Sequence, residues 1–404
     1  MNEIDKGHYH QLYGVRKARV SYFAKDFMDY ALMTSISAAI IYFSYGAGQW
    51  MTIAGLILCV GMIVLFPIRH GLELRRPVVL QRPQDIAYMI AYKARNIKPV
   101  VLLALAILLL ENLFIYLTPQ LPHHVELMRK IALYLFFMHL LGLTLYRTVV
   151  LVAHLRKKEL VREVLLQTTW KKYLAKQPNI TLHILHAYAT GVLTHIIMIA
   201  PWYLVINHLN FSVLALPIVC LLNVATQFQH FKVLNAWFYR DHWLGHNSEF
   251  EFLYLHGTHH DAIPCGLIGV AGNGHLEGFL RYTVSFPTQF FNPLVSFALF
   301  TAVVKQDIDT HQYVPCVFPK RTRSFHEVTQ HSTHHFGRLE PYSLGLKSDQ
   351  LSMSEGARNA ARDLNRGLPV ELRNSIELDE HLTEFQWDNT PYRQYLDLFD
   401  RYQK

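Results

Sequence analysis

The chain has 404 residues, of which 51% are hydrophobic and 17% are charged, and its mean hydropathy is positive. These values exclude an ordinary water-soluble globular protein and favour an integral membrane protein. The formal net charge of +8 fits basic loops that face anionic lipid headgroups, so we expect no nucleic-acid partner.

Six apolar runs follow a polar N-terminal arm, residues 1–26, which shows no cleavable signal sequence. Each run approaches or exceeds the length of about 17 to 25 residues that a helix needs to cross a membrane. Short polar breaks join the runs in pairs, so the sequence predicts an all-α fold with a transmembrane region of six helices over 27–228. The six runs are 30–46, 50–68, 99–117, 131–153, 180–206 and 211–228.

The basic residues predict how these helices are oriented. The N-terminal arm carries five Lys and Arg residues, and the segments 69–98 and 154–179 carry seven each. The loops on the opposite side hold only Arg129 and Lys130. Lys and Arg accumulate in short cytoplasmic loops. We therefore expect a multi-pass protein of a bacterial inner membrane or the endoplasmic reticulum, with both termini and the chain after 228 in the cytoplasm.

Several ionisable residues lie within the expected spans, where charge is costly and by default suggests a function. Glu111 and Arg147 are interpreted as a structural ion pair between the third and fourth spans. His183 and His186 begin the fifth span, and for them packing at the membrane interface is favoured over metal binding. His195 lies deeper in the same span.

The region after the spans, residues 229–348, is rich in histidine. Eleven of the 24 histidines fall between 242 and 335, in three compact boxes and three single positions. On a helix, residues three or four apart share one face, so each box directs several imidazoles to one point. Neutral imidazoles bind iron, zinc, copper and nickel, and the lack of thiolates disfavours a structural zinc site. The boxes are His242-x-x-x-His246, His256-x-x-His259-His260 and His331-x-x-His334-His335.

Composition and spacing disfavour other interpretations of this region. A solvated loop rich in histidine is the plain alternative, but two copies of H-x-x-H-H are improbable from composition alone. The four cysteines show no C-x-x-C spacing, which indicates neither a disulfide framework nor an iron–sulfur cluster. His326 is favoured as a surface residue or a partner of a ligand. Five carboxylates are possible acceptors for ring N–H groups, although a surface role is favoured for each: Asp241, Glu249, Glu251, Asp261 and Glu277.

Two further elements complete the chain. The segment 278–304 is apolar but interrupted by Pro287 and Pro293, and both of its ends are expected on the cytoplasmic side. It predicts a re-entrant or interfacial helical hairpin, because irregular backbone at membrane depth must be covered by protein or line a cavity. The tail 349–404 mixes charged and apolar residues and predicts amphipathic cytoplasmic helices.

The histidine boxes resemble those of the fatty acid hydroxylase superfamily, which comprises integral-membrane di-iron enzymes such as sterol desaturases and C4-methyl sterol oxidases. The resemblance covers residues 229–345. It adds His275, followed here by Leu276 where the family has proline, and His311, which precedes an aromatic residue. The implied metal ligands are His242, His246, His256, His259, His260, His275, His311, His331, His334 and His335.

The resemblance implies a catalytic domain over 229–348 that holds two iron ions and uses O2 to hydroxylate a C–H bond of a long-chain lipid. It implies no catalytic residues beyond the metal ligands. Desaturation of a lipid by the same centre is the alternative reaction. A metal transporter is a further alternative of another class, but transport favours ionisable residues at midplane depth on several spans, whereas the boxes lie outside the predicted spans.

The sequence also predicts an external source of electrons. It contains no G-x-G-x-x-G motif after a strand, no cysteine cluster and no His-Pro-Gly-Gly haem element. We therefore expect ferredoxin, or cytochrome b5 with its reductase, to dock on the cytoplasmic face, where basic segments attract an acidic carrier.

Overall fold

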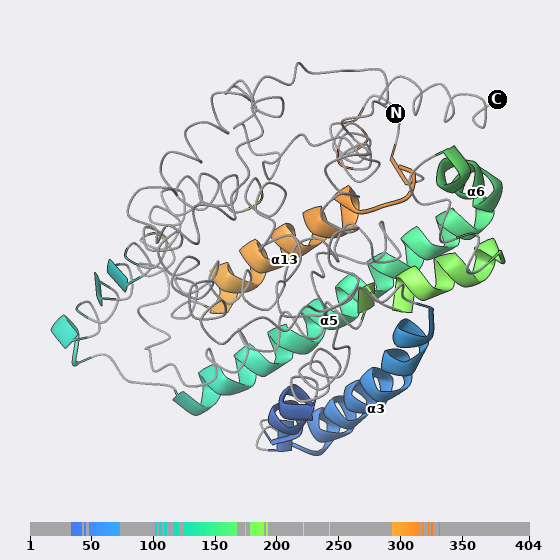
Figure 1. Ribbon diagram of the computed structural model, residues 1–404. Coiled ribbons are helices and arrows are strands. Elements are labelled where there is room, and N and C mark those ends of the chain that lie inside the picture. The colour runs from blue at the N-terminus through green and yellow to red at the C-terminus, as the bar shows by residue number, and fades with distance from the viewer. Residues whose placement is uncertain are drawn as a thin grey trace, which may run out of the picture.

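The computed structural model describes four longer helices and the chain around them (Figure 1). The continuous described stretches are 34–42, 44–45, 48–72, 116–120, 125–167, 178–189, 191–192 and 293–315. Single described residues are Leu102, Leu105, Ala106, Leu109, Leu110, Leu113, Leu174, Leu221, His242, Val317, Phe318, Thr322, Phe325 and His331.

The described residues form helices and contain no strand, in agreement with the all-α prediction. The longer helices are α3 (Gln49–Leu72), α5 (Val125–Arg156), α6 (Lys158–Gln167) and α13 (Pro293–Thr310). Within this part of the chain, one stretch of 24 residues, Leu133–Arg156, is both long and apolar enough to cross a membrane. The six-helix transmembrane arrangement as a whole stays a prediction.

Two predicted spans correspond to complete helices. Helix α3 contains the run 50–68, and α5 contains the run 131–153 and extends beyond both of its ends. The described residues of the runs 30–46, 99–117 and 180–206 are also helical. Only Leu221 is described in the run 211–228, and it is helical too.

A tight helical hairpin joins residues 34–45 to α3. Gly48 has a φ of 117°, which favours glycine, and it lies at the turn directly before α3. The Cys59 thiol contacts the Ser37 carbonyl at 3.5 Å. A Cβ on Gly55 would lie 2.7 Å from the Ser44 hydroxyl oxygen. Gly55 therefore permits the two antiparallel helices to approach closely, as small residues do between membrane helices.

Helices α5 and α13 pack side by side and run in the same direction (Figure 1). His139 Nδ1 lies 2.8 Å from the Thr301 hydroxyl, and the Tyr146 hydroxyl donates to Asp309 at 2.5 Å. The second contact lies further toward the C-terminus than the first on both helices, so the two helices are parallel. Helix α13 forms the second part of the segment predicted as a hairpin, and it continues past 304 to Thr310. Residues 278–292 lie outside the described residues, so the hairpin stays a prediction.

Helix α6 follows α5 after a single turn residue and has one buried and one polar face. Val161 and Leu165 are fully buried, whereas Lys158 and Arg162 are exposed. The next described helix, 180–189, begins at Asn179, whose side-chain oxygen accepts the Thr181 and Leu182 backbone N–H groups. It returns along α5, where Tyr188 and Thr148 hydroxyl oxygens lie 3.0 Å apart.

The two faces of α5 have the reverse polarity of a helix at the surface of a water-soluble protein. Polar side chains, His139, Arg147 and His154, are at most 2% exposed. On the opposite face, apolar side chains are 41% to 58% exposed, and these are Tyr134, Met138, Leu141, Leu145, Val149 and Val152. The helix thus presents hydrocarbon outward and buries its nitrogen-bearing groups.

Candidate metal centre

Two predicted ligands from separate motifs meet at the end of α13. His311 follows the last residue of α13, and His331 is the first histidine of the third box. Their Nε2 atoms lie 2.9 Å apart, and their ring centroids lie 4.4 Å apart at an interplanar angle of 73°. The two rings therefore direct the same nitrogen to one point although twenty residues separate them.

The separation of these nitrogens suits a shared metal ion. At metal–nitrogen distances of about 2.0 to 2.1 Å, two imidazole nitrogens on one ion lie roughly 3 Å apart at the right angles of octahedral coordination, and further apart in the tetrahedral coordination of zinc. The observed 2.9 Å matches the octahedral spacing. In the absence of metal, the same distance allows one neutral ring to donate an N–H to the other.

The backbone of α13 fixes which His311 nitrogen is available. The ring is 4% exposed, and its Nδ1 lies 2.8 Å from the carbonyl oxygen of Asp307, one turn earlier. The Nδ1–H donates to this carbonyl, which leaves the lone pair of neutral imidazole on Nε2. The Asp307 carboxylate lies 3.2 Å from the same Nδ1 and is also buried. Nε2 is the nitrogen that faces His331.

A second carboxylate, Asp309, anchors α13 to α5. Its two oxygens accept hydrogen bonds from the Tyr146 hydroxyl and the Lys305 ammonium group, each at 2.5 Å. The ammonium group also lies 5.0 Å from the centre of the Tyr146 ring. Burial raises the pKa of the Asp309 carboxyl, and the hydrogen bonds from Lys305 and Tyr146 partly offset that rise. This contact joins the C-terminal part of α13 to α5.

Of the other predicted ligands, His242 is described: it is helical and 2% exposed. Among the residues that the structure describes, no group of three or more histidine, cysteine or carboxylate side chains is arranged to hold a metal. The remaining predicted ligands lie outside the described residues and stay predictions: His246, His256, His259, His260, His275, His334 and His335. The same holds for His195, His326, Glu111 and the five carboxylates Asp241, Glu249, Glu251, Asp261 and Glu277.

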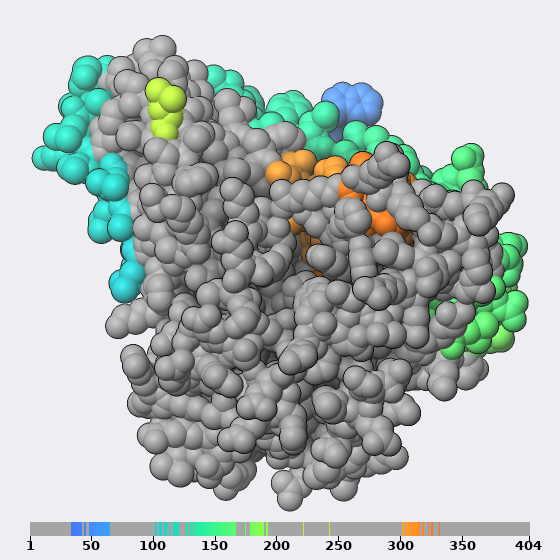
Figure 2. Space-filling view, turned by 90° about the horizontal axis from the view of Figure 1, so that it is seen from above, coloured from blue at the N-terminus to red at the C-terminus, as the bar shows by residue number. Residues whose placement is uncertain are grey.

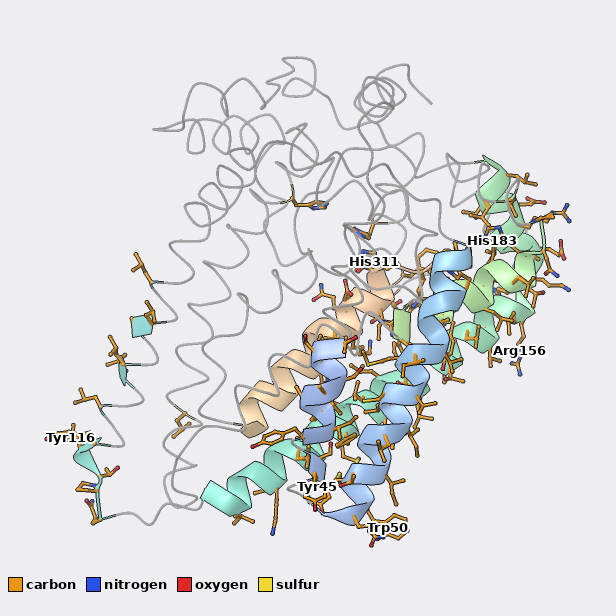
Figure 3. All side chains as sticks on the ribbon, turned by 60° about the horizontal axis from the view of Figure 1, so that its bottom comes forward. Tyr45, Trp50, Tyr116, Arg156, His183 and His311 are labelled. Atoms are coloured by element: carbon orange, nitrogen blue, oxygen red, sulfur yellow. The ribbon has the colours of Figure 1, made fainter. Side chains whose placement is uncertain are left out.

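The histidines expected at the start of the fifth span are buried. His183 and His186 are 1% and 2% exposed on the helix 180–189, and His183 lies at about the same height as His311 in the view of Figure 3. The sequence favoured packing at the membrane interface for both residues, and both side chains lie in the protein interior.

Sequence reasoning missed two buried histidines of α5, His154 near its C-terminal end and His139 in its middle. His154 donates from Nδ1 to the Val150 carbonyl at 2.8 Å, the same local geometry as His311, and its ring packs edge-on against Tyr313. His139 contacts α13. The signal was the spacing of 139, 147 and 154, which places three nitrogen-bearing residues on one helix face.

Comparison of the chain with models of protein families, with characterised proteins and with solved structures finds no match.

Proposed function

We propose that the protein is a membrane-bound di-iron oxygenase that uses O2 to hydroxylate a C–H bond of a long-chain lipid. The contact of His311 with His331 is the observation that carries the proposal: two histidines of the predicted ligand set direct Nε2 atoms to one point, 2.9 Å apart. The absence of thiolates among the boxes favours iron or another redox metal over structural zinc.

When bound, a pair of iron ions supplies O2 activation and an oxidant that removes hydrogen from an unactivated C–H bond. The chain's own residues bind the metals, orient the ligands and exclude water. His311 and His331 are held with their Nε2 atoms together. Tyr313, Val314 and Phe325, which lie between or beside them in the chain, are 0% exposed, and such burial keeps bulk water from the ligands.

Desaturation of the lipid remains the alternative reaction, because the same ligand set serves both outcomes. A metal transporter remains a second candidate from another class, favoured by the buried polar face of α5 with His139, Arg147 and His154. The two classes differ in what they do with iron: an oxygenase retains it, whereas a transporter moves it across the bilayer.

The function is tested with purified full-length protein and with sealed vesicles. We expect the protein to retain close to two irons per chain and, with reductant and O2, to convert a long-chain lipid into a product one oxygen atom heavier. Lipid profiles of cells with and without the gene identify that lipid. A product lighter by two hydrogens indicates desaturation. Iron uptake into vesicles without any lipid product, or zinc as the sole retained metal, contradicts the proposal.

A multi-pass membrane location is part of the proposal, and the outward apolar faces of α3 and α5 support it. On α3, the side chains of Ile57, Val60 and Ile63 are 59% to 66% exposed. Tyr45, Trp50 and Tyr116 are 79% to 82% exposed and lie below His311 in the view of Figure 3. Exposed Trp and Tyr are typical of a membrane–water interface.

The proposed orientation predicts which surfaces react from outside the cell. Gln120 and Arg162 are both exposed, but they belong to opposite sides of the predicted bilayer. In a variant whose four cysteines are replaced by serine, we expect Gln120→Cys to react with an impermeant thiol reagent in intact cells. Arg162→Cys is expected to react only after the membrane is opened. Equal labelling of both positions in intact cells argues against the cytoplasmic metal centre.

A further inference from the structure

Two acidic residues near the end of α13 have different partners. Asp309 accepts hydrogen bonds from Tyr146 and Lys305, so its carboxylate connects α13 to α5. Asp307 precedes it by two residues, and its Oδ1 lies 3.2 Å from Nδ1 of His311. On a helix, residues two apart point in different directions. The two carboxylates therefore belong to separate contacts, one between helices and one at the predicted metal ligand.

The contact of Asp307 with His311 has a main-chain and a side-chain part. The Asp307 carbonyl accepts the Nδ1–H at 2.8 Å, and the Thr310 hydroxyl donates to the same carbonyl at 3.2 Å. This part fixes the tautomer and survives any change of the Asp307 side chain. The carboxylate adds a negative charge beside the ring, at a site where Asp307 and His311 are 8% and 4% exposed. Low exposure means that water screens this charge weakly.

We propose that Asp307 is a positioning residue for the metal centre and acts through His311. When Nε2 donates its lone pair to a metal, the ring becomes more positive, and the buried carboxylate stabilises that charge. A carboxylate on the far nitrogen of a ligating imidazole raises the basicity of the ligand and holds the ring in orientation. Asp307-x-x-x-His311 has the one-turn spacing that brings two side chains together on a helix.

This inference rests on the proposed metal centre, and Asp307→Asn tests it in the purified full-length protein. Asparagine keeps the size of the side chain and removes its charge. We expect iron to bind about 10- to 100-fold more weakly, as measured by competition with a chelator. We also expect a more positive midpoint potential, measured by the electron paramagnetic resonance of the mixed-valence state, because loss of a nearby negative charge disfavours the oxidised ion.

The matched control is Asp309→Asn, the same substitution on the same helix at the carboxylate that faces α5. It is expected to lower Tm, since Tyr146 and Lys305 lose a charged acceptor, and to leave the iron affinity and the potential unchanged. Asp307→Glu restores the charge and is expected to recover most of the affinity, which separates the role of the charge from a general disturbance of the helix.

The outcomes distinguish the inference from the proposed function. If the wild-type protein retains no iron, the metal centre itself is wrong. If the wild-type protein retains two irons and Asp307→Asn binds them as tightly and at the same potential, the positioning role of Asp307 is overturned. Equal weakening by Asp307→Asn and Asp309→Asn also overturns it, because the effect then reflects the packing of α13 rather than the charge beside His311.

Discussion

Substitution of His311 by alanine is expected to remove at least one of the two irons and to abolish turnover. The His311 Nε2 lies 2.9 Å from Nε2 of His331, and the His311 Nδ1–H donates a hydrogen bond to the Asp307 carbonyl. Removal of the ring therefore takes away a ligand whose orientation the helix has already fixed. Loss of a partner of a ligand typically lowers metal affinity or activity about 10- to 100-fold, and loss of the ligand itself should exceed that.

The same result is expected for His331→Ala and for alanine at the other box positions His259, His260, His334 and His335. The measurements are iron per chain and product formed per minute, with the oligomeric state and Tm as checks on folding. His123→Ala is the control, because His123 lies in the loop predicted on the opposite side of the membrane, and it should be nearly silent. Full activity of His311→Ala or His335→Ala is incompatible with the ligand assignment.

The helices with strong apolar character were predictable from the sequence. Hydropathy predicts the run 131–153 because nearly every residue in it is apolar, and α5 indeed contains it. The helix begins earlier, at Val125, because the residues 126–130 are all good helix formers although three of them are charged. Hydropathy measures where lipid can cover a helix, whereas helix ends depend on propensity and capping. The predicted ends of a helix therefore differ from the observed ends even where the helix itself is predicted correctly.

Helix α13 contains a proline that the sequence analysis interpreted as an interruption of the helical segment. Pro293 was interpreted as an interruption, but proline is well tolerated at the first position of a helix, where its missing N–H would be unbonded in any case. Pro293 is the first residue of α13. The helix that begins at Pro293 carries Asp307 to the predicted ligand His311 and Asp309 to its contact with α5.

The packing of α5 against α13 could not be predicted from sequence patterns. His139 and Thr301 are 162 residues apart, and Tyr146 and Asp309 are 163 apart. Nothing in a single sequence links such positions, because the contact depends on how helices from different parts of the chain pack. His331 was predicted as a ligand from the spacing of its box and His311 through resemblance, but neither prediction places their Nε2 atoms 2.9 Å apart.

The requirement for a separate electron carrier is the second large effect that we expect. A di-iron oxygenase receives electrons one at a time, and the sequence contains no motif for a nicotinamide, a flavin, a haem or an iron–sulfur cluster. Purified enzyme with O2, lipid and NAD(P)H alone should therefore be inactive. Addition of ferredoxin or cytochrome b5, together with its reductase, should restore turnover. Sustained turnover with NAD(P)H and no carrier means that the chain contains a redox module after all.

The carrier is expected to dock beside α6, at the end of α5 that approaches the metal centre. Arg156, Lys158 and Arg162 are exposed there, and Figure 2 shows atoms of α5 and α13 reaching the surface on the same side of the molecule. An exposed basic surface accelerates association with an acidic carrier, and salt weakens this attraction. The double variant Arg156→Glu, Arg162→Glu should raise the KM for the carrier about tenfold at low salt.

The kcat of this double variant at saturating carrier should change little, because neither residue touches the predicted ligands. Lys130→Glu is the matched control: it reverses one exposed charge on the same helix, α5, but near the opposite end. It should leave the KM for the carrier unchanged at every salt concentration. If Lys130→Glu raises the KM as much as the double variant does, the effect comes from net charge rather than from a docking surface beside α6, and the carrier binds elsewhere.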